Sequence, residues 1–234
     1  MPLFGRFLKS NTMVLALKYG GGVIIAGDRR TVENYYGIVA DDAVKIAQLT
    51  RFSAMACAGF CSVIDDLERN MQATTGSFED NYQRILSVDG QVHFLQRLLE
   101  GWWFNSLAFW YPMIALPVLA AFDFKLGLSR VFSFYEDSSF HEAKFLAGAG
   151  CGFEAVKGLI IDRWEEGMDT SLAMELVVRA MLHSGISSCG VSDLRIVLPK
   201  IALIDQRGFR WVPERTVSGT RRKILRELRG KGGL

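Results

Sequence analysis

Cysteine and histidine side chains are the first candidates for chemistry, because both types bind metal ions. A tetrahedral zinc site usually draws on two closely spaced pairs of such ligands. Cys57 and Cys61 stand close together, but no histidine pair of matching spacing accompanies them; the other candidates are Cys151, Cys189, His93, His141 and His183. We therefore predict no metal and no cofactor, and we expect reduced thiols in a cytoplasmic protein.

Composition argues against two classes of partner. Half of the 234 residues are hydrophobic, 22% are charged and the formal net charge is +2. Such a chain can bury the core of one larger domain, and it lacks the positive field of a nucleic-acid-binding protein. The apolar stretch at residues 107–122 contains Pro112 and Pro117 and is shorter than the roughly 20 residues that span a bilayer. We expect neither nucleic acid nor a membrane as partner.

The N-terminal quarter predicts β-strands. Two aliphatic runs, residues 13–19 and 22–28, flank a glycine-rich turn, as in a hairpin whose backbone angles glycine adopts at little cost. Three shorter apolar runs follow, at residues 36–39, 45–49 and 53–58. The start of the chain, residues 1–11, is too short and too interrupted by basic residues to be a signal peptide.

Helices and strands alternate after residue 60. Ser62 is expected to cap a helix that ends before Thr74, and an apolar stripe from Val92 to Trp103 predicts a second helix that packs on a sheet. The remaining patterns predict strands at residues 113–122 and 130–135, helices after residues 150 and 168, and strands at residues 195–203 and 209–212. This order predicts two stacked sheets flanked by helices.

The C-terminal end is the one place where composition changes. Residues 221–234 carry six basic side chains against Glu227 alone. We interpret this segment as a solvated or partner-facing basic tail, with anion binding as the alternative.

The segment that begins at Thr12 resembles the start of a mature bacterial proteasome β subunit, most closely the actinobacterial type. In that family a threonine begins the mature chain, an aspartate followed by arginine closes the second strand, and a lysine lies on a strand shortly afterwards. Thr12, Asp28 and Lys45 match in type and order, and further similar segments lie at residues 58–59, 115–123, 198–205 and 212–214.

This resemblance implies an α+β fold, the N-terminal nucleophile hydrolase fold. It is a four-layer αββα sandwich of two antiparallel sheets flanked by helices. The implied organisation is a propeptide at residues 1–11, a β-type domain at residues 12–220 and the basic tail at residues 221–234.

The resemblance also implies a threonine endopeptidase whose nucleophile is the Thr12 hydroxyl. An N-terminal amine, with a pKa of about 7.7 to 8.0, is a suitable base for that hydroxyl near neutral pH. Thr12 has such an amine only after residues 1–11 are removed, so the chain would be made as a zymogen. Lys45 would promote proton loss from Thr12, and Asp28 would orient Lys45; a purely structural Asp28–Lys45 ion pair is the alternative.

Other positions are assigned by the resemblance alone. Gly59 matches a glycine whose backbone N–H stabilises the oxyanion, and Ser188 matches an accessory serine. Small or apolar residues near the specificity pocket favour hydrophobic substrate side chains; they are Thr31, Ala43, Ala47, Cys57 and Cys61.

Three positions depart from the family. Asn11 replaces the glycine that usually precedes the nucleophile, Ala149 replaces a serine beside it, and Gly185 stands where relatives have an aspartate. Loss of a group that orients a catalytic residue lowers a rate by roughly one to several powers of ten. A catalytically inert structural ring subunit is therefore the alternative hypothesis.

The partners are likewise implied by the resemblance. They are proteasome α subunits, other β subunits in a heptameric ring, an ATPase unfoldase and unfolded protein substrates. A third hypothesis is an amidase of the wider N-terminal-nucleophile group, which would act on a small molecule without any ring.

Overall fold

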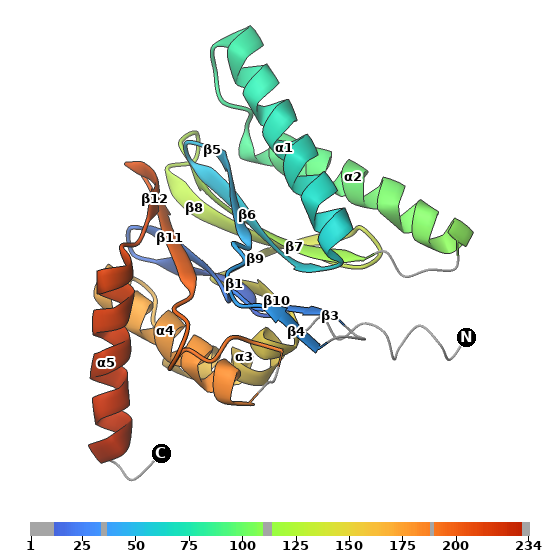
Figure 1. Cartoon of the computed structure of the whole chain (residues 1–234). Helices are drawn as coiled ribbons and strands as arrows, with labels where there is room; N and C mark the ends of the chain where they lie inside the picture. The colour runs from blue at the N-terminus through green and yellow to red at the C-terminus, as the bar shows by residue number, and fades with distance from the viewer. Residues whose placement is uncertain (1–11, 34–36, 110–113, 188–189, 231–234) are drawn as a thin grey trace.

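The computed structural model describes residues 12–33, 37–109, 114–187 and 190–230 (Figure 1). Two five-stranded antiparallel sheets stack face to face between helices. The first sheet has the order β10-β1-β2-β11-β12 and the second the order β5-β6-β7-β8-β9. This arrangement confirms the predicted four-layer sandwich.

The first sheet and three helices make up one half of the sandwich. The first sheet consists of β1 (Val14–Tyr19), β2 (Gly22–Gly27), β10 (Leu146–Ala149), β11 (Lys200–Asp205) and β12 (Gly208–Trp211). Its outer face is covered by α3 (Cys151–Arg163) and α4 (Thr170–Ser187), and α5 (Glu214–Gly230) packs on α4.

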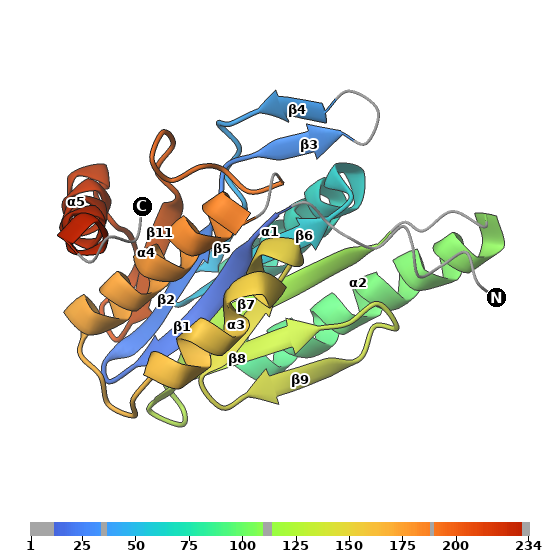
Figure 2. The same ribbon diagram turned by 90° about the horizontal axis from the view of Figure 1, so that it is seen from below.

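The second sheet is covered by the other two helices of the described chain. It consists of β5 (Ile46–Thr50), β6 (Ser53–Gly59), β7 (Ala115–Asp123), β8 (Leu128–Phe134) and β9 (Phe140–Ala143). The helices α1 (Cys61–Tyr82) and α2 (Val88–Phe109) lie on its outer face. A small hairpin, β3 (Thr31–Glu33) and β4 (Gly37–Ala40), projects beyond the sheets (Figure 2).

Three layers of apolar side chains hold these elements together. Successive side chains of a strand point to opposite faces of its sheet, so one strand contributes to two of these layers. In β1, Val14 and Ala16 face the second sheet, while Leu15 and Leu17 face α3 and α4. The alanines of β6 face the first sheet, and its Met55 packs toward α1 and α2. Strands buried on both faces read as continuous apolar runs, which is why they were predictable.

The structure corrects two predicted boundaries. Helix α1 continues past Thr74 to Tyr82, and its N-cap is Phe60, without a side-chain cap bond, so Ser62 is not the cap. The polar side chain of Thr75 is accommodated because its hydroxyl lies within hydrogen-bond distance of the carbonyl oxygens of Leu49 (2.8 Å) and Met71 (2.9 Å) and can donate to either. Strand β11 begins at Lys200 rather than at residue 195.

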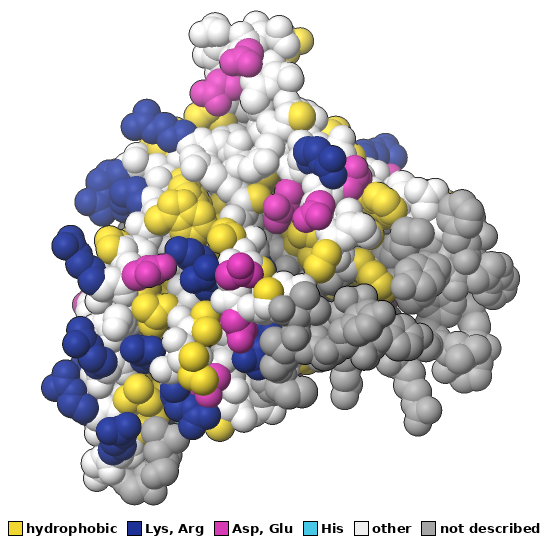
Figure 3. Space-filling model, viewed as in Figure 1, with side chains coloured by type: hydrophobic (Ala, Val, Ile, Leu, Met, Phe, Trp, Pro, Cys, Tyr) yellow, Lys and Arg dark blue, Asp and Glu magenta, His cyan; other side chains and the backbone are white. Residues whose placement is uncertain are grey.

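The segment expected as a basic tail is helical through residue 230. A boundary at residue 221 falls inside α5, which buries Val217 and Ile224. Lys223 and Glu227 pair with Glu175 and Arg179 of α4, at 2.7 and 2.6 Å. Basic side chains gather over α5 on the face seen in Figure 3. None of the helices in the described ranges combines the length and apolar character needed to span a bilayer.

Candidate active site

Three strand ends bring Thr12, Asp28 and Lys45 together. Thr12 precedes β1, Asp28 follows β2, and Lys45 precedes β5 of the other sheet. The antiparallel register pairs Val14 with Gly27, and the N–H of Asp28 donates to the carbonyl of Met13 (3.0 Å). A Cβ atom at Gly27 would lie 3.2 Å from Cβ of Lys45, so glycine allows the second sheet to approach here.

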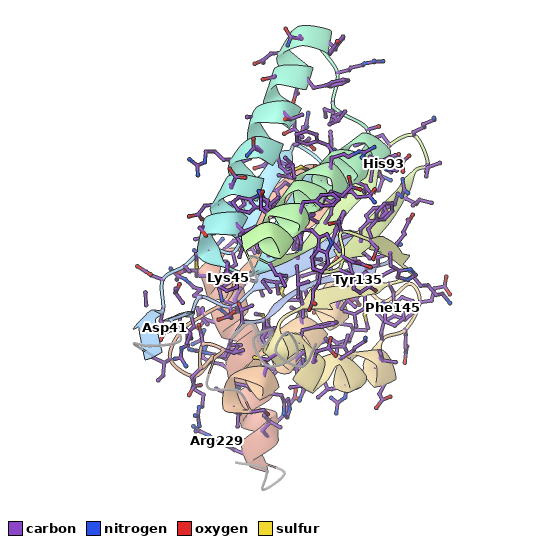
Figure 4. The ribbon with its side chains drawn as sticks, turned by 90° about the vertical axis from the view of Figure 1, so that its right-hand side faces the viewer. Asp41, Lys45, His93, Tyr135, Phe145 and Arg229 are labelled. Carbon is purple, nitrogen blue, oxygen red and sulfur yellow. The ribbon has the colours of Figure 1, made fainter. Side chains whose placement is uncertain are left out.

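The carboxylate of Asp28 is the centre of the site. Its Oδ1 accepts hydrogen bonds from Thr12 Oγ1 (2.7 Å), the N–H of Met13 (2.9 Å) and Lys45 Nζ (2.7 Å). Lys45 Nζ also contacts Thr12 Oγ1. Asp28 is 0% and Thr12 5% exposed, so the three groups interact away from bulk water. Figure 4 shows Lys45 in relation to the surrounding side chains.

The environment alters the acid–base character of Lys45. Burial lowers the pKa of Lys45, and the neighbouring Asp28 carboxylate opposes part of that shift. A lysine of lowered pKa releases a proton more readily than an exposed one, and its cation lies directly beside the Thr12 hydroxyl. The arrangement can therefore ease ionisation of that hydroxyl or accept a proton from it.

Sequence reasoning missed the residues that hold the far side of Asp28. Its Oδ2 accepts from the N–H of Arg30 (2.9 Å), and the N–H and Oγ of Ser192 lie at 3.3 and 3.5 Å. Arg30 forms a bidentate ion pair with Asp41, at 2.9 and 3.0 Å, which lowers the pKa of Asp41. No spacing pattern links Ser192 to residues so distant in sequence; Arg30, two residues after Asp28, was the only local signal.

Two glycines shape the backbone beside Thr12. Gly150 has a φ of +92°, and a Cβ there would overlap the carbonyl of Thr12. The N–H of Gly152, in the first turn of α3, donates to that same carbonyl (3.1 Å). Ala149, the last residue of β10, pairs with Val14 and brings no polar side chain to the site.

Gly59 ends β6 and also requires glycine. Its φ is +142°, and a Cβ there would overlap the carbonyl oxygen of Ile114. Cys61, exposed at the start of α1, lies near enough to raise the pKa of Lys45 electrostatically.

The other residues expected around the pocket occupy different surroundings. Thr31 lies on β3, Ala43 donates its N–H to the carbonyl of Arg29 (3.1 Å), and Ala47 is buried on β5. Cys57 belongs to the core beneath α1 and α2, and burial raises the pKa of its thiol. Ser188 lies outside the described residues.

Gly185 is enclosed by backbone. A Cβ at Gly185 would lie 2.5 Å from the carbonyl oxygen of Ser192. Within the described ranges, no group of three or more His, Cys, Asp or Glu side chains is arranged to hold a metal ion.

Comparison with known proteins identifies the family of this chain. The family model described as "Proteasome subunit" matches residues 8–198. The chain is 24% identical to the proteasome subunit beta of Acidimicrobium ferrooxidans over 97% of its own length and 83% of that protein. It is 27% identical to the subunit of Jonesia denitrificans, over 87% and 67% of the two chains, and 26% identical to that of Acidothermus cellulolyticus, over 92% and 75%. The chain therefore belongs to the proteasome subunit family.

Proposed function

We propose that this chain is a threonine-type endopeptidase subunit of a proteasome core, active once residues 1–11 have been removed. The observation that carries the proposal is the buried cluster in which Asp28 Oδ1 accepts from both Thr12 Oγ1 and Lys45 Nζ, each at 2.7 Å. A structural ion pair needs no hydroxyl between its members. Lys45 Nζ contacts Thr12 Oγ1 as well, which supports a function in ionising that hydroxyl.

The proposed reaction is acyl transfer through Thr12. The free α-amine of Thr12 takes the proton of Oγ1, which attacks the peptide carbonyl and forms an ester as the leaving amine departs with a proton. Lys45 stabilises the developing negative charge on Oγ1, and the backbone N–H of Gly59 stabilises the oxyanion. Water then hydrolyses the ester and restores Thr12. This reaction requires neither a metal nor another cofactor.

The proposed setting is a ring-stacked chamber in the cytoplasm. The partners would be proteasome α subunits, further β subunits in a heptameric ring and an ATPase unfoldase that delivers unfolded proteins. Membership of the family supports assembly with other proteasome subunits. The small or apolar character of Ala43, Ala47 and Cys61, which the resemblance assigns to the pocket, supports a preference for hydrophobic substrate side chains.

A catalytically inert ring subunit is the second candidate. Ala149 favours it, because this residue lies on the strand that pairs with β1 and offers no hydroxyl. In that case the Asp28–Lys45 pair would serve folding alone.

Intact-mass measurement distinguishes the two candidates. The chain is co-expressed with its cognate α subunit, and assembled particles are weighed before and after treatment with a peptide epoxyketone, which reacts with both the amine and the hydroxyl of an N-terminal threonine. We expect a chain that begins at Thr12 and gains one inhibitor mass. Thr12→Ser should still gain it, and Thr12→Ala should not. Assembled particles that retain residues 1–11 and take up no inhibitor would establish the inert subunit.

A further inference from the structure

The two oxygens of the Asp28 carboxylate have different partners. Oδ1 faces Thr12, Met13 and Lys45, as described above. Oδ2 is held instead by Arg30 and Ser192. A carboxylate is planar, so the contacts of Oδ2 determine where Oδ1 points. The partners of Oδ2 therefore control the geometry between Thr12 and Lys45 without touching either.

Three contacts of the Ser192 hydroxyl hold this side chain beside Asp28. The residue is 0% exposed, and its Oγ accepts from the N–H of Arg29 (3.0 Å). The same Oγ lies 3.2 Å from Asp41 Oδ1 and 3.5 Å from Asp28 Oδ2. A hydroxyl has one hydrogen to donate, so Ser192 Oγ donates to Asp41 Oδ1, the nearer of the two carboxylate oxygens, and lies in contact with the other.

The contacts close into a ring. Asp28 accepts from the N–H of Arg30, the guanidinium of Arg30 binds Asp41, and Asp41 is linked through Ser192 back to Asp28. The N–H of Ser192, at 3.3 Å from Asp28 Oδ2, adds a second link. Cooperative networks of this kind fix side chains more firmly than single bonds.

The backbone at Ser192 also packs against Gly185 of α4. A Cβ atom at Gly185 would lie 2.5 Å from the carbonyl oxygen of Ser192 and 3.3 Å from the Cα atom of Asp193. The segment that contains Ser192 thus occupies the space that a side chain at Gly185 would need.

We propose that Ser192, held by the Arg30–Asp41 ion pair, is a positioning residue that orients the Asp28 carboxylate toward Thr12 and Lys45. The inference rests on the proposed peptidase function. It extends that function to a residue that touches neither the nucleophile nor Lys45.

The first test compares Ser192→Ala with Ser184→Ala in assembled, mature particles. Both serines are 0% exposed, but Ser184 Oγ has no hydrogen-bond partner in the described structure, so its removal should leave the rate unchanged. Active sites are counted by epoxyketone uptake, and kcat and KM are measured on a fluorogenic peptide. We expect Ser192→Ala to lower kcat per titrated site by about ten- to a hundredfold, with KM within about twofold, because a hydrogen bond to a charged group is lost.

Two further variants separate positioning from general stability. Ser192→Thr keeps the hydroxyl and should recover most of kcat. Asp41→Asn should also lower kcat. The double variant with Ser192→Ala should lose less kcat than the product of the two separate fold-losses, because the residues act in one network.

Failure of the inference about Ser192 and failure of the proposed peptidase function give different results. An active wild-type particle in which Ser192→Ala matches Ser184→Ala in kcat per site overturns the inference and leaves the peptidase intact. The same holds if Ser192→Ala lowers only the number of titrated sites. A wild-type particle that takes up no inhibitor overturns the proposed function, and with it the function of Ser192 in positioning.

Discussion

Asp28 and Lys45 each depend on the other residue to compensate a buried charge. Asp28 is completely buried, and Lys45 is its one side-chain cation at hydrogen-bond distance among the described residues. A buried pair of this kind contributes little net stability, because desolvation offsets the attraction. Removing one partner is a different matter, since the other charge then stays buried without compensation.

Lys45→Met should therefore destabilise the fold through Asp28 rather than through lost lysine contacts. We expect the free energy of unfolding to fall by about 3 kcal/mol, measured by urea denaturation of the purified chain. Adding Asp28→Asn to Lys45→Met should restore part of that loss, because the amide carries no charge. Both variants should lack peptidase activity.

The exposed Lys144 provides the matched control for that measurement. Lys144→Met should change the free energy of unfolding by less than about 0.5 kcal/mol. If Lys45→Met is as stable as Lys144→Met, Lys45 does not compensate a buried charge at Asp28.

Local sequence patterns were sufficient to predict those strands and helices that are determined by their own sequence. The β1–β2 hairpin and α4 follow from apolar runs, glycine turns and capping residues. The predicted end of α1 was wrong because the Thr75 hydroxyl bonds to the carbonyl oxygen of Leu49 in β5. That contact is distant in sequence and lies outside any local window. Likewise, Thr12, Asp28 and Lys45 were predicted through resemblance, whereas Ser192 reaches Asp28 only through folding.

Helix α1 carries a carboxyl group that should make stability depend on pH. Burial, and secondly the neighbouring Asp65, raises the pKa of Glu68 to about 7. Between about pH 4.5 and 7 the folded chain retains a proton that the unfolded chain has released, so this group's contribution to stability is lost as pH rises through that window. Glu68→Gln should raise Tm at pH 8 but not at pH 4.

The exposed Glu79 lies on the same helix and serves as control for that experiment. Glu79→Gln should change Tm by the same small amount at both pH values. A Glu68→Gln variant whose gain in Tm does not depend on pH would show that the side chain is more solvated than the structure indicates.

Helix α5 should behave as an integral part of the fold. A chain that ends at Thr220 loses the buried side chain of Ile224 and the ion pairs of Lys223 and Glu227 with α4. We expect Tm to fall by roughly 5 to 10 °C, measured by calorimetry. A chain that ends at Gly230 keeps every described contact of α5 and should match the full-length protein. Equal Tm for all three chains would mean that α5 is not docked in solution.

Stacking of the two sheets brings the residues of the site together. The first sheet supplies Thr12 and Asp28, and the second sheet supplies Lys45. The contact between Lys45 and Asp28 therefore exists as soon as the sandwich is closed, before any peptide bond is cleaved. Under the proposed function, the remaining step is release of the Thr12 amine, so removal of residues 1–11, rather than formation of the site, should limit the appearance of activity.

Asn11→Gly should therefore speed maturation without changing the mature enzyme. Glycine, the usual residue before the nucleophile in the family, has no Cβ and lets the preceding carbonyl approach the Thr12 hydroxyl with little steric hindrance. We expect assembled Asn11→Gly particles to lose residues 1–11 faster, followed by intact-mass time courses, while kcat per titrated site stays at the wild-type value because residue 11 is absent from the product. Ser10→Gly, one residue earlier, should leave the maturation rate unchanged. If Asn11→Gly particles mature at the wild-type rate, or if mature particles differ in kcat, another step than cleavage after residue 11 controls activation.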